Sequence, residues 1–190
     1  MSESGTVLAL SGRRIDAAGG PERFPLRNRS RVEALLRAAM IGAAAQTLVS
    51  SAACGSDLLA LKAAGDLGIR RRVILPFDQA TFRDQSVVDR PGDWGPLFDR
   101  ILSEVGGAGD LTLLGLRPSD RFAYEETNRA ILSEGEALAA LVDGGGGARV
   151  AVVVWDGRAG QRDDHTQQFF EEAMARGWSL CEVFSLEHAP

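Results

Sequence analysis

The sequence predicts an α/β fold, a Rossmann-like, doubly wound, mostly parallel sheet of about six strands with helices on both faces. Short apolar runs alternate along the chain with longer amphipathic segments, which is typical of repeated strand–helix units. Residues 150–155 read Val-Ala-Val-Val-Val-Trp, a continuous apolar run that predicts a strand buried on both faces. With 190 residues, 45% of them hydrophobic and 25% charged, the chain has the composition of a globular protein, and we expect a single domain over residues 1–190.

Six short apolar runs are the expected strands. They cover residues 6–10, 47–50, 72–75, 111–114, 150–155 and 180–184. Crossover connections between parallel strands are right-handed, so every strand-to-helix loop should lie at the same edge of the sheet. Ligands of open α/β sheets bind at that edge, where the strand order reverses, and these loops are therefore the candidates for a functional site.

Helices are expected between these strands from apolar periodicity and from start and stop signals. Ser30 and Glu33 form a capping box before a segment whose apolar residues fall on one helical face. Ser56 is expected to cap a helix that Gly68 ends. Three further helices are expected around residues 94–102, from Ser119 or Asp120 to about Val142, and from Asp163 or Asp164 to about Arg176. Residues 77–92 are predicted to be irregular, and Gly144–Gly147 a flexible surface turn.

Composition and charge narrow the functional classes. The net charge is −5 and no long basic run is present, so sequence-independent nucleic-acid binding is not expected. Cys54 and Cys181 are far apart and the chain has two histidines, so neither a metal site nor a disulfide framework is indicated, and no cofactor is expected. No stretch approaches the roughly 20 apolar residues of a membrane span, and the N-terminal apolar run is too short for a signal peptide. We therefore expect a cytoplasmic protein without membrane contact.

Two loops offer groups that bind anions. After the first strand, Gly12 allows a close backbone approach, and the guanidinium groups of Arg13 and Arg14 can each donate two hydrogen bonds to phosphate or carboxylate. A solvated loop with surface arginines is the alternative. After the second strand, small residues lead into a helix, where exposed backbone N–H groups and the helix dipole favour an anion. A tight turn that packs the helix on the sheet is the alternative. The candidates in this loop are Ser50, Ser51, Ala53, Cys54, Gly55, Ser56 and Asp57.

Three later loops add candidates. Arg83 is a candidate lid residue, or else a solvated arginine. Tyr124 and Asn128 share a helix face, where they would contact a base or ribose, or anchor the helix to its neighbour. Trp155-Asp156-Gly157 ends the fifth strand, and an acidic residue at such a position commonly binds ribose hydroxyls or acts on an anomeric carbon. His165 is expected at the surface, in the first turn of a helix whose dipole disfavours a charged imidazole.

Residues 49–60, with Ala63, Ala64, Gly68 and residues 73–76, resemble the nucleotide-binding core of the SLOG superfamily. That superfamily includes the Smf/DprA DNA-processing proteins, the LOG-type nucleoside-monophosphate hydrolases, and sensor domains of defence proteins and TRPM channels. Residues 23–25 and the segment 82–87 are also similar to this superfamily. Tyr124 with Asn128, and residues 154–157, resemble a subgroup of it that is often found beside signalling or effector modules. The resemblance implies a Rossmann-like sheet that binds a nucleotide-derived ligand, often as a homo-oligomer, and allows an effector protein in trans.

The chain departs from the LOG hydrolases at the last strand-to-helix loop. Those enzymes carry the motif P-G-G-x-G-T-x-x-E, and residues 160–169 keep only Thr166 of its Gly-Gly-Thr element. The phosphate cradle and the catalytic glutamate of that group therefore have no counterpart here. An exposed basic track of the kind that DNA processing needs is also missing.

Three functional hypotheses follow. In the first, the domain binds or senses a nucleotide-derived anion, such as an ADP-ribose-like or cyclic nucleotide-like molecule or a nucleoside monophosphate. Its phosphate would be held by Arg13, the 51–57 loop, Arg83 and Thr166, and its ribose or base by Asp156, Tyr124 and Asn128. In the second, the protein is a nucleotide N-glycoside hydrolase or transferase with Asp156 or Asp57 as the catalytic carboxylate. In the third, it is a non-catalytic structural or oligomerisation subunit, which exposed and mutually distant arginines 13, 83 and 158 would favour.

Overall fold

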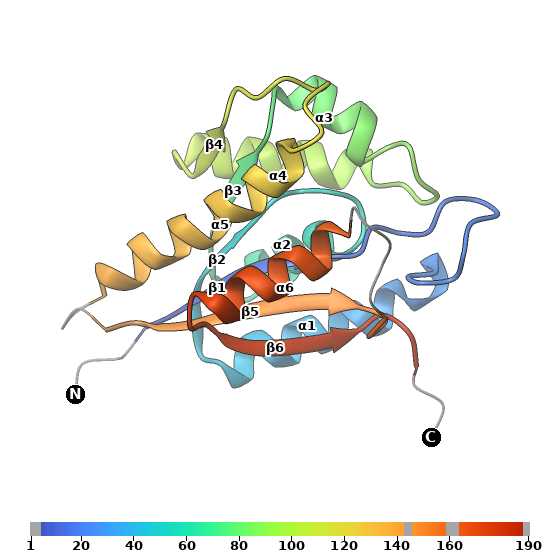
Figure 1. Ribbon diagram of the computed structural model, residues 1–190. Helices are drawn as coiled ribbons and strands as arrows, with labels where there is room; N and C mark the ends of the chain where they lie inside the picture. Colours follow the sequence, from blue (N-terminus) through green and yellow to red (C-terminus); the bar gives the residue numbers. More distant parts are fainter. Residues whose placement is uncertain (1–4, 143–145, 159–163, 188–190) are drawn as a thin grey trace.

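The structure is a computed structural model, which describes residues 5–142, 146–158 and 164–187. Six strands form one sheet in the order β4-β3-β2-β1-β5-β6, and all five neighbouring pairs are parallel (Figure 1). The strands are β1 (Thr6–Gly12), β2 (Ala45–Ser50), β3 (Arg70–Leu75), β4 (Leu111–Leu113), β5 (Ala148–Trp155) and β6 (Ser179–Phe184). The predicted Rossmann-like sheet of about six strands is confirmed, and it is parallel throughout.

The direction in which the chain adds strands reverses beside β1. From β1 the chain adds β2, β3 and β4 outward on one side, and it then returns to place β5 and β6 on the other side. β1 therefore lies between β2 and β5, with Leu10 opposite Val152 and Gly12 opposite Val154 in the β5 pairing. The carboxyl ends of β1 and β5 form the topological switch point, where open α/β sheets bind their ligands.

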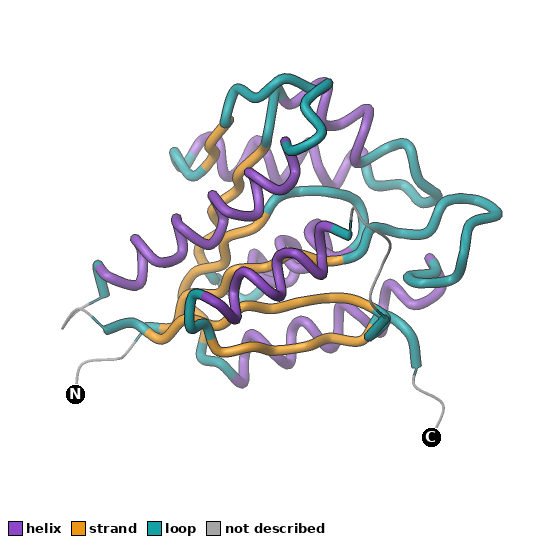
Figure 2. Tube along the Cα trace, viewed as in Figure 1, coloured by secondary structure: helices purple, strands orange, loops and turns teal. Residues whose placement is uncertain are grey.

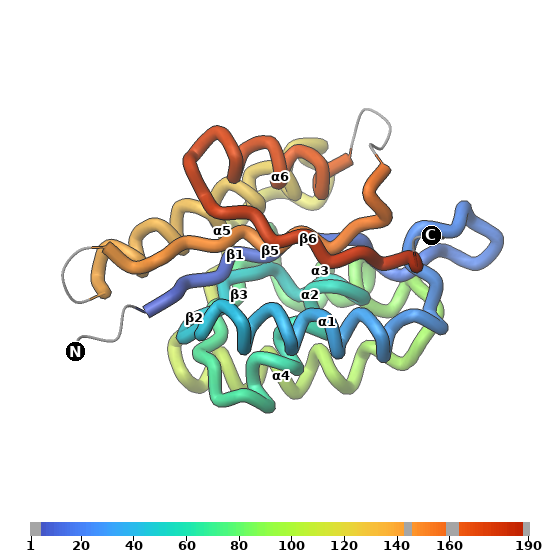
Figure 3. Tube along the Cα trace, turned by 90° about the horizontal axis from the view of Figure 1, so that it is seen from below, coloured from blue at the N-terminus to red at the C-terminus, as the bar shows by residue number. Residues whose placement is uncertain are grey.

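Helices cover both faces of the sheet. α1 (Arg29–Gly42), α2 (Ser56–Asp66) and α4 (Gly95–Gly107) lie on one face, while α5 (Ala123–Ala140) and α6 (His165–Ala175) lie on the other (Figure 3). Successive side chains of β1 point to opposite faces of the sheet and so contribute to both apolar cores. Leu8 and Leu10 belong to the core under α1, α2 and α4, and Val7 and Ala9 belong to the core under α5 and α6. Residues 151–154 of β5 are buried, as the sequence predicts.

Several helix starts differ from the sequence-based expectation. The prediction of a capping box at Ser30 and Glu33 is wrong. The 3₁₀ turn η1 (Leu26–Asn28) leads directly into α1 at Arg29, and this helix start has no side-chain cap. Gly55, with φ +94°, is the N-cap of α2 in place of Ser56, whose hydroxyl instead donates to the carbonyl of Arg13. The helix expected from Ser119 or Asp120 begins later, as α5, at Ala123.

The segment 77–92 is not irregular throughout. It contains α3 (Gln79–Ser86), whose N-cap Asp78 accepts a hydrogen bond from the Thr81 N–H. Only Phe82 and Ser86 of this helix are buried, so the segment has no apolar periodicity that a sequence reading could detect. The cap predicted for α6 is confirmed at Asp164, which accepts the N–H groups of Thr166 and Gln167. Asp163 lies outside the described residues, as do Gly144 and Gly145 of the predicted glycine turn.

The loops that follow the strands gather at one end of the sheet (Figure 2). The longest of them joins β1 to η1 and carries residues 13–25 across this end. Among the helices in the described ranges, none combines the length and the apolar character needed to cross a membrane.

Candidate functional site

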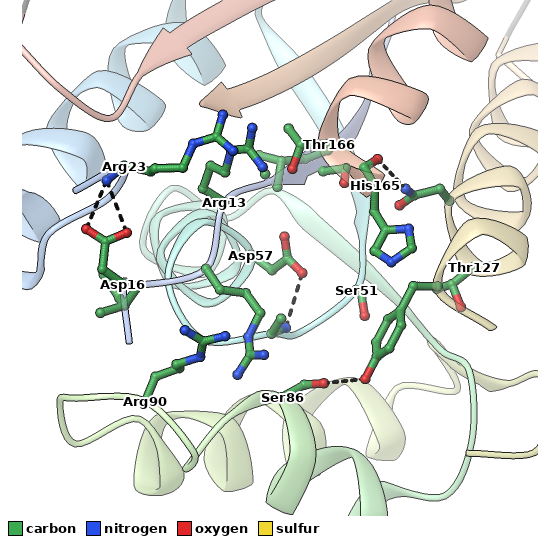
Figure 4. Close-up of a pocket in the computed structure, with 18 of the residues that line it drawn as sticks. Arg13, Asp16, Arg23, Ser51, Asp57, Ser86, Arg90, Thr127, His165 and Thr166 are labelled. Carbon is green, nitrogen blue, oxygen red and sulfur yellow. Dashed lines mark hydrogen bonds between the residues drawn. The ribbon is translucent and has the colours of Figure 1, made fainter. Parts of the chain in front are cut away.

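A pocket of about 500 Å³ opens at the carboxyl end of the sheet (Figure 4). Its wall comes from the end of β1 and the loop that follows, the β2–α2 loop, α3 with the residues after it, and the first turns of α5 and α6. Eight of the residues predicted for the site line it: Gly12, Arg13, Ser51, Ala53, Asp57, Tyr124, Asn128 and Thr166. Eight do not: Ser50, Cys54, Gly55, Ser56, Arg83, Trp155, Asp156 and Gly157.

Three amides of the β2–α2 loop already have acceptors within the protein. The Cys54 N–H donates to the Ser86 carbonyl at 2.9 Å, and the Ser56 N–H donates to the Arg13 carbonyl at 3.2 Å. The Ala53 N–H donates to the Asp57 carboxylate at 3.1 Å. These three donors are therefore not available to a ligand phosphate, which corrects, for Ala53, Cys54 and Ser56, the expectation that this turn presents open amides. Burial also raises the pKa of the Cys54 thiol, so this cysteine is a packed residue and not an activated nucleophile.

Asp57 is a buried carboxyl in the pocket wall. Only 7% of the residue is exposed, and burial raises its pKa to about 7, although the Ala53 N–H and the charge of Arg14 oppose that rise. Its Oδ2 accepts the Ala53 N–H, while Oδ1 has no hydrogen-bond partner within the described part of the chain. The pocket therefore contains a carboxyl that titrates near neutral pH and has one oxygen free to contact a ligand.

Asp156 is held in an ion-pair cluster behind the pocket. Arg23 donates to both of its oxygens, from Nε and Nη2, each at 2.9 Å, and the residue is 3% exposed. Burial alone would raise the pKa of Asp156, but the hydrogen bonds and charge of Arg23, with the charge of Arg13, lower it overall. Asp156 therefore does not face a ligand, in contrast to the role predicted for it at the end of β5.

Arg13 is neutralised by the same cluster. Its Nη1 donates to Asp164 Oδ1 at 2.9 Å and its Nη2 to Asp164 Oδ2, while Nε lies 3.7 Å from Asp156. Asp164 also accepts the N–H groups of Thr166 and Gln167, at 3.2 and 3.1 Å. The positive end of α6, where a phosphate was expected beside Thr166, is thus occupied by a carboxylate of the protein itself.

A second group of arginines has an excess of positive charge. Arg14 and Arg90 both line the pocket, and both pair with the single carboxylate of Asp89: Arg14 through Nη2, and Arg90 through Nε at 3.4 Å. Two guanidinium groups and one carboxylate leave a net charge of about +1 at this side of the pocket. The Nε of Arg14 is buried and has no hydrogen-bond partner among the described residues. Arg14 adjoins Arg13 in the sequence, whereas Arg90 lies in a segment without any recognisable motif.

The opposite side of the pocket is aromatic. The Tyr124 hydroxyl is 2.8 Å from Ser86 Oγ, and its ring lies 5.6 Å from the His165 ring, measured between centroids. Asn128 Nδ2 donates to the His165 carbonyl at 2.9 Å. These contacts anchor α5 to α3 and α6, which is the second of the two roles considered for Tyr124 and Asn128. His165, which was expected at the surface, is half-buried and lines the pocket.

Two other predicted residues point elsewhere. Arg83 pairs with Asp99 on α4, through Nε at 2.8 Å and Nη2 at 3.0 Å, and does not fold over the pocket. The Trp155 indole donates to Glu182 at 2.8 Å and stacks on Phe170. Ser51, by contrast, lines the pocket with a buried Oγ that has no hydrogen-bond partner in the described ranges.

Comparison with protein-family profiles finds no match, and no curated protein matches the sequence. Among solved structures, the chain is similar to DNA processing protein A (DprA) from Streptococcus pneumoniae, with a TM-score of 0.45 and 14% sequence identity. The match covers 95% of this chain and 59% of the DprA chain. The chain thus corresponds in length to somewhat more than half of that protein.

Proposed function

We propose that the protein binds or senses a nucleotide-derived anionic ligand in the pocket at the carboxyl end of the sheet. Candidate ligands are a nucleoside monophosphate, an ADP-ribose-like molecule and a cyclic nucleotide-like molecule. The observation that carries this proposal is the pair of arginines, Arg14 and Arg90, that share one carboxylate at the pocket wall.

The charge distribution around the pocket supports this location for the anion. Arg13 and Arg23 face two carboxylates, Asp156 and Asp164, so that cluster has little charge to offer. Arg14 and Arg90 have one carboxylate between them, and a guanidinium group can donate two parallel hydrogen bonds to a phosphate. An anion would therefore bind to these two side chains and not to the amides of the β2–α2 loop.

The size of the pocket and its aromatic side support a ligand larger than phosphate. Small-molecule sites commonly have volumes of roughly 300–1,000 Å³, and this pocket, at about 500 Å³, falls within that range. Figure 4 shows Asp57 between the side that carries Arg90 and the side that carries His165. A nucleotide with its phosphate at Arg90 would direct its sugar toward Asp57 and its base toward the rings of Tyr124 and His165.

Replacing Arg90 with glutamine is expected to weaken binding about tenfold or more, because a charge-assisted hydrogen bond contributes about 1.5–3 kcal/mol. Isothermal titration calorimetry with adenosine 5′-monophosphate, ADP-ribose and a cyclic nucleotide measures this change. Arg83→Gln is the matched control, since Arg83 pairs with Asp99 outside the pocket and its loss should leave affinity unchanged. The proposal is wrong if the unaltered protein gives no saturable heat with any of these ligands, or if both variants weaken binding equally.

A second candidate function is hydrolysis of a nucleotide N-glycosidic bond, and the open oxygen of Asp57 favours it. A carboxyl whose pKa is about 7 can act as a general base near neutral pH, which here would activate the attacking water. Asp156, the other carboxylate considered, is closed off by Arg23. We expect any release of free base, followed by liquid chromatography, to be lost in Asp57→Asn. Binding without base release in the unaltered protein would leave the binding function alone.

The structural-subunit alternative has little support from the arginines that would have favoured it. The Arg13 side chain is 14% exposed, and its guanidinium contacts the carbonyl of Arg158, so these two residues are neither isolated nor far apart. Homo-oligomerisation and an effector protein in trans remain proposals. Light scattering on the purified protein tests the first of them.

A further inference from the structure

We propose that Asp57 and Ser51 form a hydroxyl-binding subsite of this pocket, which selects ligands with a vicinal diol, such as an unsubstituted ribose, and which releases a proton when the diol binds. This inference rests on the proposed function, because it assigns the sugar of the nucleotide to named side chains. It also changes the role expected for Asp57, from part of a phosphate-binding loop to a reader of neutral hydroxyl groups.

The carboxyl of Asp57 is positioned to accept a donor from a ligand. Its Oδ2 is held by the Ala53 N–H at 3.1 Å, which fixes the plane of the group. Its Oδ1 has no donor among the described residues, although the residue is more than nine-tenths buried. Unlike the Nε of Arg14 and the Oγ of Ser51, this oxygen is not sealed from solvent, so a ligand in the pocket can donate a hydrogen bond to it.

Ser51 supplies the second polar group. The residue lines the pocket, and its Oγ is buried without a hydrogen-bond partner in the described part of the chain, so rotation about the Cα–Cβ bond would bring it to a ligand hydroxyl. Ser51 and Asp57 both belong to the β2–α2 loop and first turn, and Figure 4 shows both side chains at the pocket. That loop is fixed by the bonds from Cys54 N–H to Ser86 and from Ser56 N–H to Arg13, so the two oxygens keep a constant relative position.

The charges around Asp57 favour hydroxyl groups over a second phosphate. An ionised carboxylate repels a phosphate, and the excess positive charge lies at Arg14 and Arg90 instead. Hydroxyl groups are neutral donors that both a carboxylate and a serine can bind. In dinucleotide-binding α/β folds an acidic side chain near the switch point binds ribose hydroxyls in the same manner. A pentose that carries an anionic group fits both sides of the pocket at once.

Binding of the diol should release a proton from Asp57. Burial raises the pKa of this carboxyl to about 7, so about half of the molecules carry the proton at pH 7. Hydrogen bonds donated to a carboxylate favour its ionised form, so the bound diol lowers the pKa and expels the proton. The other charged or titratable side chains that line the pocket are Arg13, Arg14, Asp16, Arg23, Arg90, Tyr124 and His165. An imidazole generally titrates near neutral pH, so the test has to separate Asp57 from His165.

The test is calorimetric titration of adenosine 5′-monophosphate and its 2′-deoxy counterpart into the protein and into Asp57→Asn. Titrations at pH 6, 7 and 8, in buffers of different ionisation enthalpy, report the number of protons exchanged. Asparagine keeps the acceptor for the Ala53 N–H but cannot ionise, and circular dichroism checks that the variant is folded. The ligand phosphate and the other ionisable side chains of the pocket are the same in both titrations, so the difference between the two proteins isolates Asp57.

The unaltered protein is expected to prefer the ribonucleotide about tenfold, which corresponds to one hydrogen bond to a charged group. On binding the ribonucleotide at pH 7, the unaltered protein should release about half a proton per molecule. When the pH is lowered from 8 to 6, its affinity should fall about tenfold more than that of the variant. Asp57→Asn should bind both nucleotides with similar affinity, and it should lack the proton release that comes from the Asp57 carboxyl. Binding without preference for the ribonucleotide, or with the same proton release in the variant, overturns the subsite alone. Absence of binding by any nucleotide overturns the proposed function and the subsite together.

Discussion

Replacing Asp57 with asparagine is expected to stabilise the protein at pH 8 by on the order of 2–4 kcal/mol. Burial raises the pKa of this carboxyl from 3.8 to about 7, so between these values the folded state binds more protons than the unfolded state. Stability from this group is fully present below the unfolded pKa, and it is lost as the pH rises through the folded pKa. The uncharged asparagine avoids that loss, so its advantage should grow from about pH 4 to pH 7 and then remain constant.

Urea unfolding of both proteins at pH 5, 6, 7 and 8 measures the effect. Asp66→Asn is the matched control, because Asp66 lies on the same helix but is exposed and pairs only at the surface with Lys62 and Arg37. Its change should stay within about 0.5 kcal/mol at every pH. If Asp57→Asn instead destabilises the protein at pH 8, the carboxylate is well solvated or well paired, and the hydroxyl-binding subsite loses its physical basis. A carboxylate that lowers the stability of the free protein is typical of a site that exists for its ligand.

Replacing Gly55 with alanine is expected to destabilise the protein by about 3 kcal/mol or more, which is the second large effect. Gly55 has φ +94° and ψ −122°, a backbone conformation that only glycine adopts readily. An added Cβ would lie 2.8 Å from the Ile15 nitrogen and 3.0 Å from the Arg13 carbonyl oxygen. Both neighbours are backbone atoms of the segment that packs on this turn, so they cannot move aside as a flexible side chain would.

Gly68→Ala serves as the control that separates the cost of the steric contact at position 55 from the cost of a positive φ angle. Gly68 also has a positive φ, +71°, but nothing lies within 4 Å of its Cβ position. This variant should cost about 1 kcal/mol, which is the cost of the left-handed conformation alone. Thermal and urea unfolding of the two variants provide the comparison. Equal losses would show that the 13–15 segment does not restrain the turn, and that the ordering of the pocket wall has another origin.

The sequence by itself determined the fold class. The apolar runs 150–155 and 6–10 predict strands because burial on both faces demands apolar side chains at successive positions. The cap at Asp164 is equally local, because a side chain three residues away satisfies the N–H of Gln167. The 77–92 segment shows the limit of such signals, since α3 buries only one large apolar side chain, Phe82. Motif reasoning also selected the edge of the sheet at which the pocket opens, and it included Asp57 and Ser51 among the candidates.

Only the tertiary structure decided which of those candidates line the pocket. A helix N-terminus offers donors in any sequence, but whether they are free also depends on acceptors from distant segments, which for the β2–α2 turn are the carbonyls of Ser86 and Arg13. Asp156 and Asp57 are both carboxylates near the end of a strand. Arg23 donates hydrogen bonds to both oxygens of Asp156, whereas one oxygen of Asp57 has no donor among the described residues. Arg90 enters the pocket from a segment without a motif. Pairing between charges far apart in the chain is set by three-dimensional distance, which no local pattern of residues contains.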